Sequence, residues 1–482
     1  MPGGGDGVTG GLKRIAVVGA GVAAWFSAAY LARVLKRLGT EIVLVPAGRE
    51  TTAPVLATLP SFEAVHSVLG FDARDLMRAT EASFRLGTEY VSGGGIHTYG
   101  DTGTAFGNVP FHLAWRAQAE NTSPGAFGDC SLAVQAAREG RFAPPLEGGP
   151  PGSLYSPGLH MNGPAYLNFL RRAARHYGVV QAGDLSFGEA ASETGRLVLS
   201  DGSALTSDLV IDTVGLDARA DWTLAGVMPE TVHVFWGKSA SRQPLGLARL
   251  RSVAGNVAVD TPLNTEIFRA LIAGSEAAAH RATSVLRRDG FTPLADSPHV
   301  FMPGWCAAPW QGRTVRIGDA ACCLPPAEAP ELRIIQIGLE TLVHLLPGGC
   351  PEVPERGEYN RMALESWRAL ADFVSLAFMP AGEIPKDAPA SLALRLQNFT
   401  SRGRIILADG ESFTRESWAA ALIAAGWQMD RADTHAAALP KERVRSSIAG
   451  IAGTLAASCE TLPDQRTFLR RAGLLAPQAG GA

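Results

Sequence analysis

The sequence predicts an α/β fold with a parallel sheet, followed by a mostly helical C-terminal part. Two glycine-containing turns, each at the end of a strand-like apolar run, predict the sheet. Beyond Pro347 the pattern becomes mostly helical to the end of the chain, which predicts the second part.

The first turn, Gly19-Ala20-Gly21, follows an apolar run at 15–18 and leads directly into a helical pattern. Gly19 permits a tight turn, and Gly21 lets the backbone approach a phosphate group. The helix N-terminus then supplies free N–H groups. Ala24 replaces the third glycine of the fingerprint, at a position that only sets helix–strand packing. The turn therefore predicts a dinucleotide pyrophosphate site, with an ordinary strand–helix turn as the alternative.

The second turn lies within residues 314–321, which read as a strand, a turn and the start of a helix. Gly318-Asp319 at the strand end is typical of the second half of an FAD site. The Asp319 carboxylate would accept a hydrogen bond from a ribityl hydroxyl, and the helix start would face the isoalloxazine. This signal is weak alone, but together with the first turn it predicts FAD as the cofactor.

The second strand of the sheet is expected at 41–45 and ends at Pro46. An acid that binds the adenosine ribose is expected at such a strand end, and the nearest one is Glu50, several residues on. The loss of this acid predicts that FAD binds more weakly than in proteins that have it.

Composition excludes several other classes of protein. The chain has 482 residues with 43 basic and 46 acidic side chains, a balance that predicts no face for nucleic acid. The six cysteines form no CxxC pair and no zinc spacing, so we expect reduced thiols and no metal site. No apolar run is long enough for a membrane helix, and the glycine-rich start lacks the order of a signal peptide. A cytoplasmic protein is the simplest expectation.

We expect three parts along the chain: a flexible glycine-rich tail at 1–13, the FAD-binding part at 14–347 and a helical domain at 348–482. Residues 92–160 are rich in glycine and proline and read as a long insertion built on loops with helical islands. Residues 61–91 have an apolar pattern that predicts helix.

Four segments carry a more specific resemblance: GAGVAAW at 19–25, ATEASFRLGTEYVSG at 79–93, LHMNGPAYLNFLRRAA at 159–174 and IGDAACCLPPAEAPE at 317–331. They resemble the flavin-dependent tryptophan halogenase family. The resemblance implies a box-shaped, glutathione-reductase-like FAD module topped by a helical pyramid. It also implies reduced FAD from a separate flavin reductase, a small aromatic, indole-like substrate, and hypohalous acid that travels through a tunnel to a lysine. A glutamate then assists proton removal.

The residues that match the family's catalytic positions are Arg85 and Glu328, and they are our candidate catalytic residues. Arg85 stands where the family has its lysine. Its guanidinium stays protonated and offers no nucleophilic amine. A salt-bridged arginine on the surface is the alternative interpretation. Glu328 keeps the family's glutamate.

The halide site of the family is also altered. Its Glu-Ser-Thr-Gly sequence corresponds here to Glu328-Ala329-Pro330-Glu331. Pro330 lacks the N–H that would bind chloride, and the Glu331 carboxylate repels an anion unless it is protonated. A plain proline-rich loop is the alternative interpretation of this stretch.

Two further family signatures are missing. The segment at 55–60 lacks the Gly-Glu of the flavin strap, and residues 244–250 stand where a tryptophan-rich signature is expected. Single tryptophans and histidines specify little by themselves. We expect these to be structural: Trp236, Trp305, Trp310, His97, His112, His160 and His344.

Two functions of different class remain. The first is a flavoenzyme that activates oxygen without lysine-dependent halogenation, as a monooxygenase, an oxidase or an altered halogenase. The second is a degenerate, non-catalytic homologue that binds a substrate, a peptide or an active paralogue. The sequence does not decide between a monomer and a homodimer. The predicted cofactor-binding residues are Gly19, Ala20, Gly21, Ala24, Gly318 and Asp319.

Overall fold

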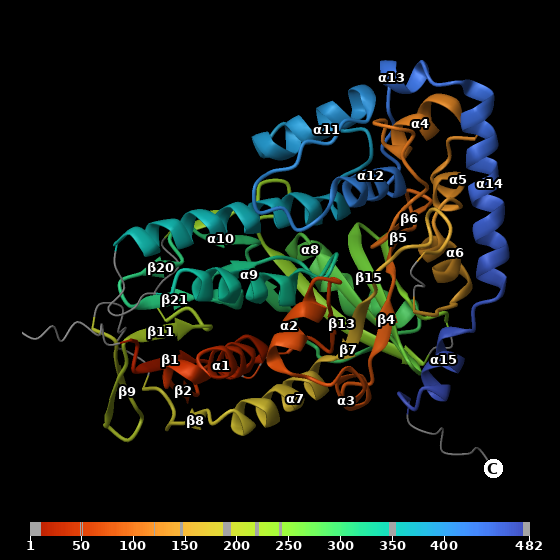
Figure 1. Ribbon diagram of the computed structural model, residues 1–482. Helices are drawn as coiled ribbons and strands as arrows, with labels where there is room; N and C mark the ends of the chain where they lie inside the picture. Colours follow the sequence, from red (N-terminus) through yellow and green to blue (C-terminus); the bar gives the residue numbers. More distant parts are fainter. Residues whose placement is uncertain are drawn as a thin grey trace, which may run out of the picture.

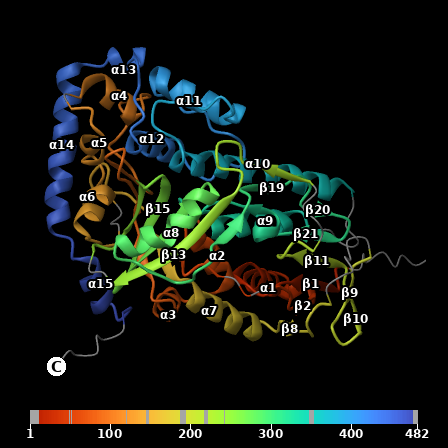
Figure 2. The same cartoon turned by 180° about the vertical axis from the view of Figure 1, so that it is seen from behind.

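A computed structural model describes residues 11–48, 50, 52–119, 121–144, 148–186, 194–216, 221–240, 243–346 and 353–475. Figure 1 shows a layered α/β part at the lower left and the C-terminal helices above it on the right. A large, mostly antiparallel sheet lies beside the layered part, and Figure 2 shows it from behind. The predicted α/β class is confirmed.

The first sheet has six strands in the order β20-β21-β11-β1-β2-β8, and all neighbours are parallel except β20 and β21. Both faces of β1 are covered. Ile15 and Val17 face the main core with α1, whereas Ala16 and Val18 pack with residues of the β9–β10 hairpin. An unbroken apolar run is what a doubly covered parallel strand requires. The elements are β1 (Arg14–Val18), α1 (Val22–Val34), β2 (Glu41–Val45), α7 (Gly163–His176), β8 (Val180–Gln181), β9 (Arg196–Val198), β10 (Ala204–Thr206), β11 (Leu209–Asp212), β20 (Trp310–Gln311) and β21 (Thr314–Arg316).

The helical prediction for 61–91 is right only in its first part. Gly70 ends the first helix in the left-handed region, with φ 71°, and a second helix ends before Thr80. The following residues form strands, because Ser83, Phe84 and Arg85 pair with a strand that comes much later in the chain. Tertiary pairing here overrides the local apolar spacing. The elements are β3 (Val55–Ala57), α2 (Phe62–Leu69), α3 (Ala73–Ala79), β4 (Ser83–Arg85), β5 (Gly87–Tyr90), β6 (Gly95–Thr98) and β7 (Gly158–Asn162).

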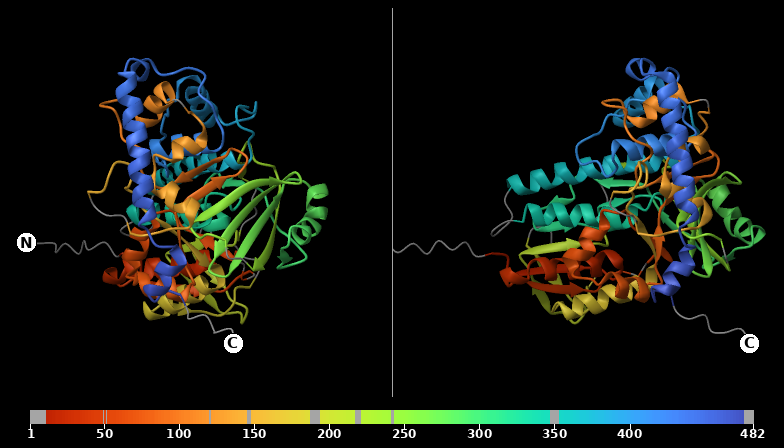
Figure 3. Two further views of the ribbon diagram at one scale, coloured as in Figure 1. Left: turned by 90° about the vertical axis from the view of Figure 1, so that its right-hand side faces the viewer. Right: turned by 45° about the vertical axis from the view of Figure 1, so that its right-hand side comes forward.

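A second large sheet has the order β17-β13-β16-β15-β14-β5-β6, with β18 also paired to β13. Within it β13, β16, β15 and β14 are antiparallel neighbours, whereas β14 and β5 are parallel. Helix α8 packs on β13 and β16 at the outer face, as Figure 3 shows. The elements are β13 (Val232–Ala240), β14 (Leu247–Val253), β15 (Asn256–Leu263), β16 (Glu266–Ala273), α8 (Glu276–Arg288), β17 (Thr292–Pro293) and β18 (His299–Phe301). A small sheet beside it has β12 (Trp222–Leu224), β19 (Gly304–Cys306) and β22 (Cys322–Cys323).

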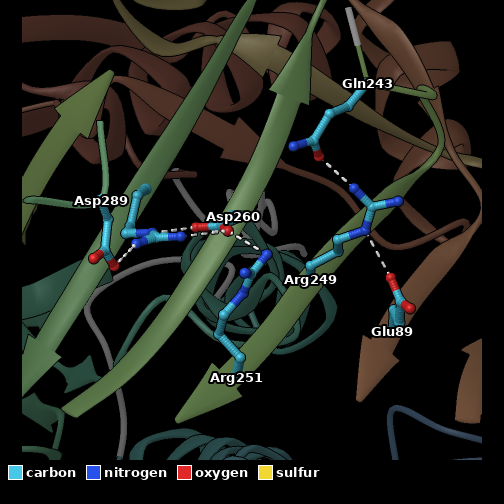
Figure 4. Close-up of polar contacts among 7 residues, drawn as sticks. Glu89, Gln243, Arg249, Arg251, Asp260 and Asp289 are labelled. Carbon is cyan, nitrogen blue, oxygen red and sulfur yellow. Dashed lines mark hydrogen bonds and ion pairs between the residues drawn. The ribbon is translucent and has the colours of Figure 1, made fainter. Parts of the chain in front are cut away.

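A buried charge network fixes the register of this sheet. Asp260 accepts two hydrogen bonds from Arg269, at 2.6 and 2.9 Å, and forms an ion pair with Arg251 at 2.7 Å. Arg269 also donates to Asp289 at 2.7 Å, and its guanidinium lies over the ring of Phe291. Figure 4 shows the carboxylate of Asp260 between the arginines of neighbouring strands. The negative charge of the buried Asp260 carboxylate is thus compensated by an arginine on each neighbouring strand.

The C-terminal helices interleave with the helices of residues 92–160. In Figures 1 and 3 α14 runs beside α4 and α6, and α12 packs against β6. The predicted domain limits at 13 and 347 stay predictions. No helix among the described residues is long and apolar enough to cross a bilayer. The elements are α4 (Phe111–Gln118), α5 (Pro124–Gly128), α6 (Leu132–Glu139), α9 (Pro330–His344), α10 (Val353–Val374), α11 (Ala390–Arg402), α12 (Arg415–Ala424), α13 (Thr434–Ala437), α14 (Lys441–Glu460) and α15 (Gln465–Arg471).

Replacing the central carboxylate of the charge network should destabilise the protein strongly. We expect Asp260→Ala to lower the free energy of unfolding by about 3–5 kcal/mol, because the buried Arg269 would lose both of its hydrogen bonds to Asp260 and keep only Asp289 as an ion-pair partner. Glu266→Ala, which breaks the exposed ion pair with Lys238 on the same sheet, should change it by about 1 kcal/mol or less. Urea denaturation followed by circular dichroism measures both. Equal losses in the two variants would contradict this account.

Candidate functional site

The turn after β1 leaves no room for a side chain at its first glycine. Gly19 has φ 149° and donates its N–H to the carbonyl of Val45 at 3.0 Å. A Cβ atom there would overlap the Thr213 hydroxyl and lie 2.9 Å from the Cβ of Ala24. Ala24 is fully buried against this turn, so its position is set by helix–strand packing.

The N-terminus of α1 is suited to an anion. Gly21 is the N-cap residue in extended conformation, and no side chain caps the helix. The first turn contains no acidic residue, so its N–H groups and the helix dipole face no competing charge from the helix itself. A pyrophosphate fits this arrangement.

The second glycine turn lies against the start of α1, the helix that follows the first turn, although about 300 residues separate the two turns in the chain. The carboxyl ends of β1, β11 and β21 meet at one edge of the sheet because the three strands are parallel neighbours. Gly318 has φ 66°, and a Cβ atom there would lie 2.7 Å from the Cβ of Ala23 on α1. Asp319 is exposed at this edge. The two predicted halves of an FAD site are thus in contact.

One part of the prediction for this turn is wrong. Residues 318–320 form a single 3-10 turn, not the start of a helix, and the short strand β22 follows. Helix α9 begins only at Pro330. Pairing of Cys322 with Trp305 explains the difference, because the chain adds a strand to another sheet before the helix starts.

Among the described residues that follow β2, the nearest acid, Glu50, is not free. Strand β2 ends at Val45, and Pro46 follows it where the ribose-binding acid was expected. Glu50 forms an ion pair with Arg171 of α7, so its carboxylate is already engaged.

Arg85 and Glu328 form a buried ion pair at the heart of the structure. Arg85 is only 1% exposed, so the interpretation as a surface arginine is wrong. Its Nη2 donates to Glu328 Oε2 at 3.2 Å and to the Thr88 hydroxyl at 3.0 Å. Glu328 also accepts hydrogen bonds from Thr88 at 2.9 Å and from Tyr90 at 2.8 Å. Arg85 and Glu328 are 243 positions apart in the chain, and each matches a different motif of the family. The fold brings them into contact.

These partners hold Glu328 in its ionised form. Burial alone raises the pKa of the Glu328 carboxyl. The nearby His97 ring, the charge of Arg85 and the Tyr90 hydroxyl together outweigh burial and lower that pKa to about 2. The carboxylate is therefore negative throughout the physiological range.

Among the histidines, His97 belongs to this cluster. Its Nδ1 lies 3.7 Å from Glu328 Oε1, and its Nε2 lies 3.4 Å from the hydroxyl of Ser417. The sequence does not indicate this role, because a single histidine in a strand carries no local signal. His160 is fully buried, and burial, then the charge of Arg85, lowers its pKa well below the ordinary value.

The turn that carries Glu328 is not a plain loop. Glu328 and Ala329 both have φ 59°, a left-handed conformation that costs energy for residues other than glycine. Pro330 is the first residue of α9, and Glu331 stands in the first turn of that helix. Burial, then the nearby charge of Asp319, raises the pKa of Glu331 to about 7. The turn thus directs one acid into the cluster and holds another between the cluster and the Gly318 turn.

A cavity of about 370 Å³ opens beside the Arg85–Glu328 pair. Tyr99 forms part of its wall, and the guanidinium carbon of Arg85 lies 5.0 Å from the centre of the Tyr99 ring. Ser417, the partner of His97, also lines it. The described lining residues are Leu59, Pro60, Ser61, Tyr99, Gly100, Asp101, Leu154, Tyr155, Ser156, Ser412, Phe413, Thr414, Glu416 and Ser417. Arg85 and Glu328 therefore lie behind the wall of the cavity, not on it.

The altered strap segment connects the cavity to the cluster. Thr58 accepts a hydrogen bond from Arg85 Nη1 at 3.4 Å through its carbonyl, and its hydroxyl accepts the N–H of Leu159 at 2.8 Å. Leu59 and Pro60, the next residues, line the cavity.

The remaining single residues have these places. Trp305 and Trp310 are buried in the core, whereas Trp236 is half-buried against it. His112 contacts the carbonyl of Gly403 at 2.8 Å, and His344 is exposed near the end of α9. No group of histidine, cysteine, aspartate or glutamate among the described residues could hold a metal ion.

A model of the tryptophan halogenase family matches residues 14–240 and 260–441. The chain belongs to the tryptophan halogenase family. This family is flavin-dependent, and both glycine turns and the Arg85–Glu328 pair lie within the matched residues.

Solved structures of the family share the fold. BrvH, a flavin-dependent halogenase from Brevundimonas sp. BAL3, is 23% identical with a TM-score of 0.84 over 96% of this chain and 99% of BrvH. Xcc4156, a flavin-dependent halogenase from Xanthomonas campestris, is 26% identical with a TM-score of 0.83 over 96% of this chain and 98% of its own. The tryptophan halogenase of Shewanella frigidimarina is 16% identical with a TM-score of 0.79, over 96% of this chain and 98% of its own.

Glu331 should make stability depend on pH in a defined window. Its pKa rises from an ordinary 4.5 to about 7 on folding, so between these values the native state keeps a proton that the unfolded chain has lost. Stability should therefore fall as pH rises from 4.5 to 7. As pH rises from 5 to 8, the free energy of unfolding of Glu331→Gln should rise by roughly 1–3 kcal/mol relative to that of the unchanged protein. Urea denaturation at both values measures it.

The control for this comparison is Glu442→Gln, which removes an exposed carboxylate from α14. It should leave the difference between the two pH values as it is in the unchanged protein. A Glu331→Gln variant whose stability follows the same pH course as that protein would show that Glu331 does not titrate in this window.

Proposed function

We propose that the chain is an FAD-dependent oxidoreductase that acts on an aromatic, indole-like substrate without lysine-dependent halogenation. The observation that carries the proposal is the close packing of Gly318 on Ala23 of α1, the helix that follows the first glycine turn, at one edge of the parallel sheet. FAD would lie with its pyrophosphate over Gly19, Ala20 and Gly21 and its ribityl chain near Asp319. Reduced by a separate flavin reductase, the cofactor supplies electrons for the activation of oxygen.

The cavity and the cluster behind it supply the chain's own chemistry. The aromatic rings of Tyr99 and Phe413 form walls that suit a planar substrate. Ser417 and His97 connect the cavity with Glu328, at 3.4 and 3.7 Å. A proton released in the cavity can pass through Ser417 to the imidazole of His97, beside which the Glu328 carboxylate stays ionised.

The arrangement argues against the family's halogenation chemistry. The Arg85 guanidinium has no free lone pair, and its ion pair with Glu328 holds it behind the cavity wall. Pro330 lacks an N–H, and Glu331 becomes negative above its pKa of about 7. We therefore favour a monooxygenase, an oxidase or an altered halogenase.

A non-catalytic homologue is the second candidate, and one observation favours it. Both members of the Arg85–Glu328 pair have side chains that are at most 1% exposed, as expected for a structural pair. Such a protein would use the cavity to bind a substrate, a peptide or a paralogue. FAD binding separates the candidates, because a purified yellow protein with a flavin spectrum favours the first.

Titration of the apo-protein should show saturable FAD binding. We expect affinity below that of relatives with a ribose-binding acid, by about 1.5–3 kcal/mol for one lost charge-assisted hydrogen bond. Gly19→Ala and Gly21→Val should abolish binding, because a Cβ at Gly19 overlaps Thr213 and a side chain at Gly21 blocks the phosphate. Gly357→Ala, on α10 with open space around it, is the matched control. Absence of saturation at high micromolar flavin would exclude the first candidate.

With FAD, a flavin reductase, NADH, oxygen and chloride or bromide, the protein should yield no halogenated tryptophan above the level without enzyme. Arg85→Lys alone should stay silent, because Pro330 and Glu331 still disfavour the halide. The comparison is Arg85→Lys, the pair Pro330→Thr with Glu331→Gly, and all three together, read by mass spectrometry over several indoles. Robust halogenation by Arg85→Lys alone would show that the halide binds elsewhere.

A further inference from the structure

We propose that the cavity selects an arene that carries a protonated amine and lacks a carboxylate, which makes an arylalkylamine the substrate class. The proposal rests on the proposed function in taking this cavity as the substrate site. It is carried by the charges that the cavity presents, together with its aromatic walls.

The only charged residues among the described lining residues are Asp101 and Glu416. Neither has an ion-pair partner in the described part of the chain. Burial, then the charge of Glu416, raises the pKa of Asp101, so the two carboxylates are close enough to repel each other. An ammonium group between them would relieve this repulsion, whereas a substrate carboxylate would add a third negative charge.

No arginine or lysine of the described lining can receive a carboxylate. Arg85 lies behind Tyr99 and is neutralised by Glu328 at 3.2 Å. Arg415, next to Glu416 in the chain, is outside the lining. The amine of a free amino acid would therefore strengthen its binding in the cavity, and its carboxylate would weaken it. An arylalkylamine has the favourable amine without the unfavourable carboxylate.

The aromatic walls are held firmly. The ring of Phe413 stacks on Phe373 with centroids 3.6 Å apart, and the ring of Tyr99 meets His97 edge-on at 5.2 Å. The Tyr99 hydroxyl has no hydrogen-bond partner although it is shielded from solvent. The cavity lining thus offers the aromatic side chains of Tyr99 and Phe413 to an arene, and the exposed carboxylates of Asp101 and Glu416 to its amine.

Calorimetric titration with tryptamine, tryptophan and indole-3-propionate tests the selection, because the three share one ring system and differ in charge. We expect the Kd of tryptamine to be at least about tenfold lower than that of indole-3-propionate, with tryptophan between them. The preference should shrink at high salt, since the carboxylates are exposed. Asp101→Asn and Glu416→Gln should each raise the Kd of tryptamine about three- to tenfold, and should leave the Kd of indole-3-propionate unchanged or lower it.

Asp296→Asn is the control, because it removes one fully exposed carboxylate far from the cavity lining. It should change none of the three Kd values. Equal affinity for the three compounds, a preference for the carboxylate, or tryptamine binding that ignores Asp101→Asn and Glu416→Gln would each overturn the proposal. FAD titration of the same samples separates the two questions. Binding of FAD without any of the three compounds overturns the amine selection alone, whereas binding of tryptamine without FAD supports the selection and excludes the flavoenzyme.

Discussion

The buried ion pair between Arg85 and Glu328 is the interaction on which the centre of this molecule depends. It joins β4 to the turn before α9, and its hydrogen-bond partners Thr88 and Tyr90 add β5. His97 brings in β6. Removing one member of a buried pair leaves the other charged and without compensation, which typically costs 3–5 kcal/mol. The pair is therefore a fixed part of the scaffold as well as a candidate for chemistry.

This pair also decides what the cavity beside it can use. Four donors or charges surround the Glu328 carboxylate, so it cannot swing into the cavity without leaving several of them unsatisfied. The guanidinium is restrained in the same way by Thr88 and the carbonyl of Thr58. Arg85 and Glu328 therefore act on the cavity only indirectly. Arg85 contacts the lining residue Tyr99, and Glu328 is connected through His97 to the lining residue Ser417. The charges on the cavity surface itself come from other residues.

The sequence predicts the parts of the fold that have local signatures. The opening strand, turn and helix form where the pattern places them, because Gly19 and the apolar run act over neighbouring residues. The match of Arg85 and Glu328 to one family's motifs also brought together two residues that are in contact. The strands β4 and β5 were missed because their pairing partners, β7 and β14, lie far along the chain.

The cavity could not be predicted for the same reason. Tyr99 and Asp101 come from one loop, and Phe413, Glu416 and Ser417 come from the start of α12 and the residues before it. Each is an ordinary residue within its own segment, and no pattern in either segment marks it. Only the packing of α12 on β6 makes them neighbours. The role of His97 follows from that same contact.

The interleaving of α4 and α6 with the C-terminal helices has a consequence for how the chain can be divided. Val109, Leu113 and Ala114 form one apolar cluster with Ala436 and Val444. A fragment that ended near residue 347 would expose the apolar side chains of α4 in this cluster to solvent. A fragment that began there would lack α4 and α6, on which α14 packs. Neither fragment should make a useful crystallisation or expression target by itself. Synthesis of α13 and α14 is then the step at which the early helices first find their partners, so the growing chain has to keep those apolar surfaces from aggregating until these two helices emerge.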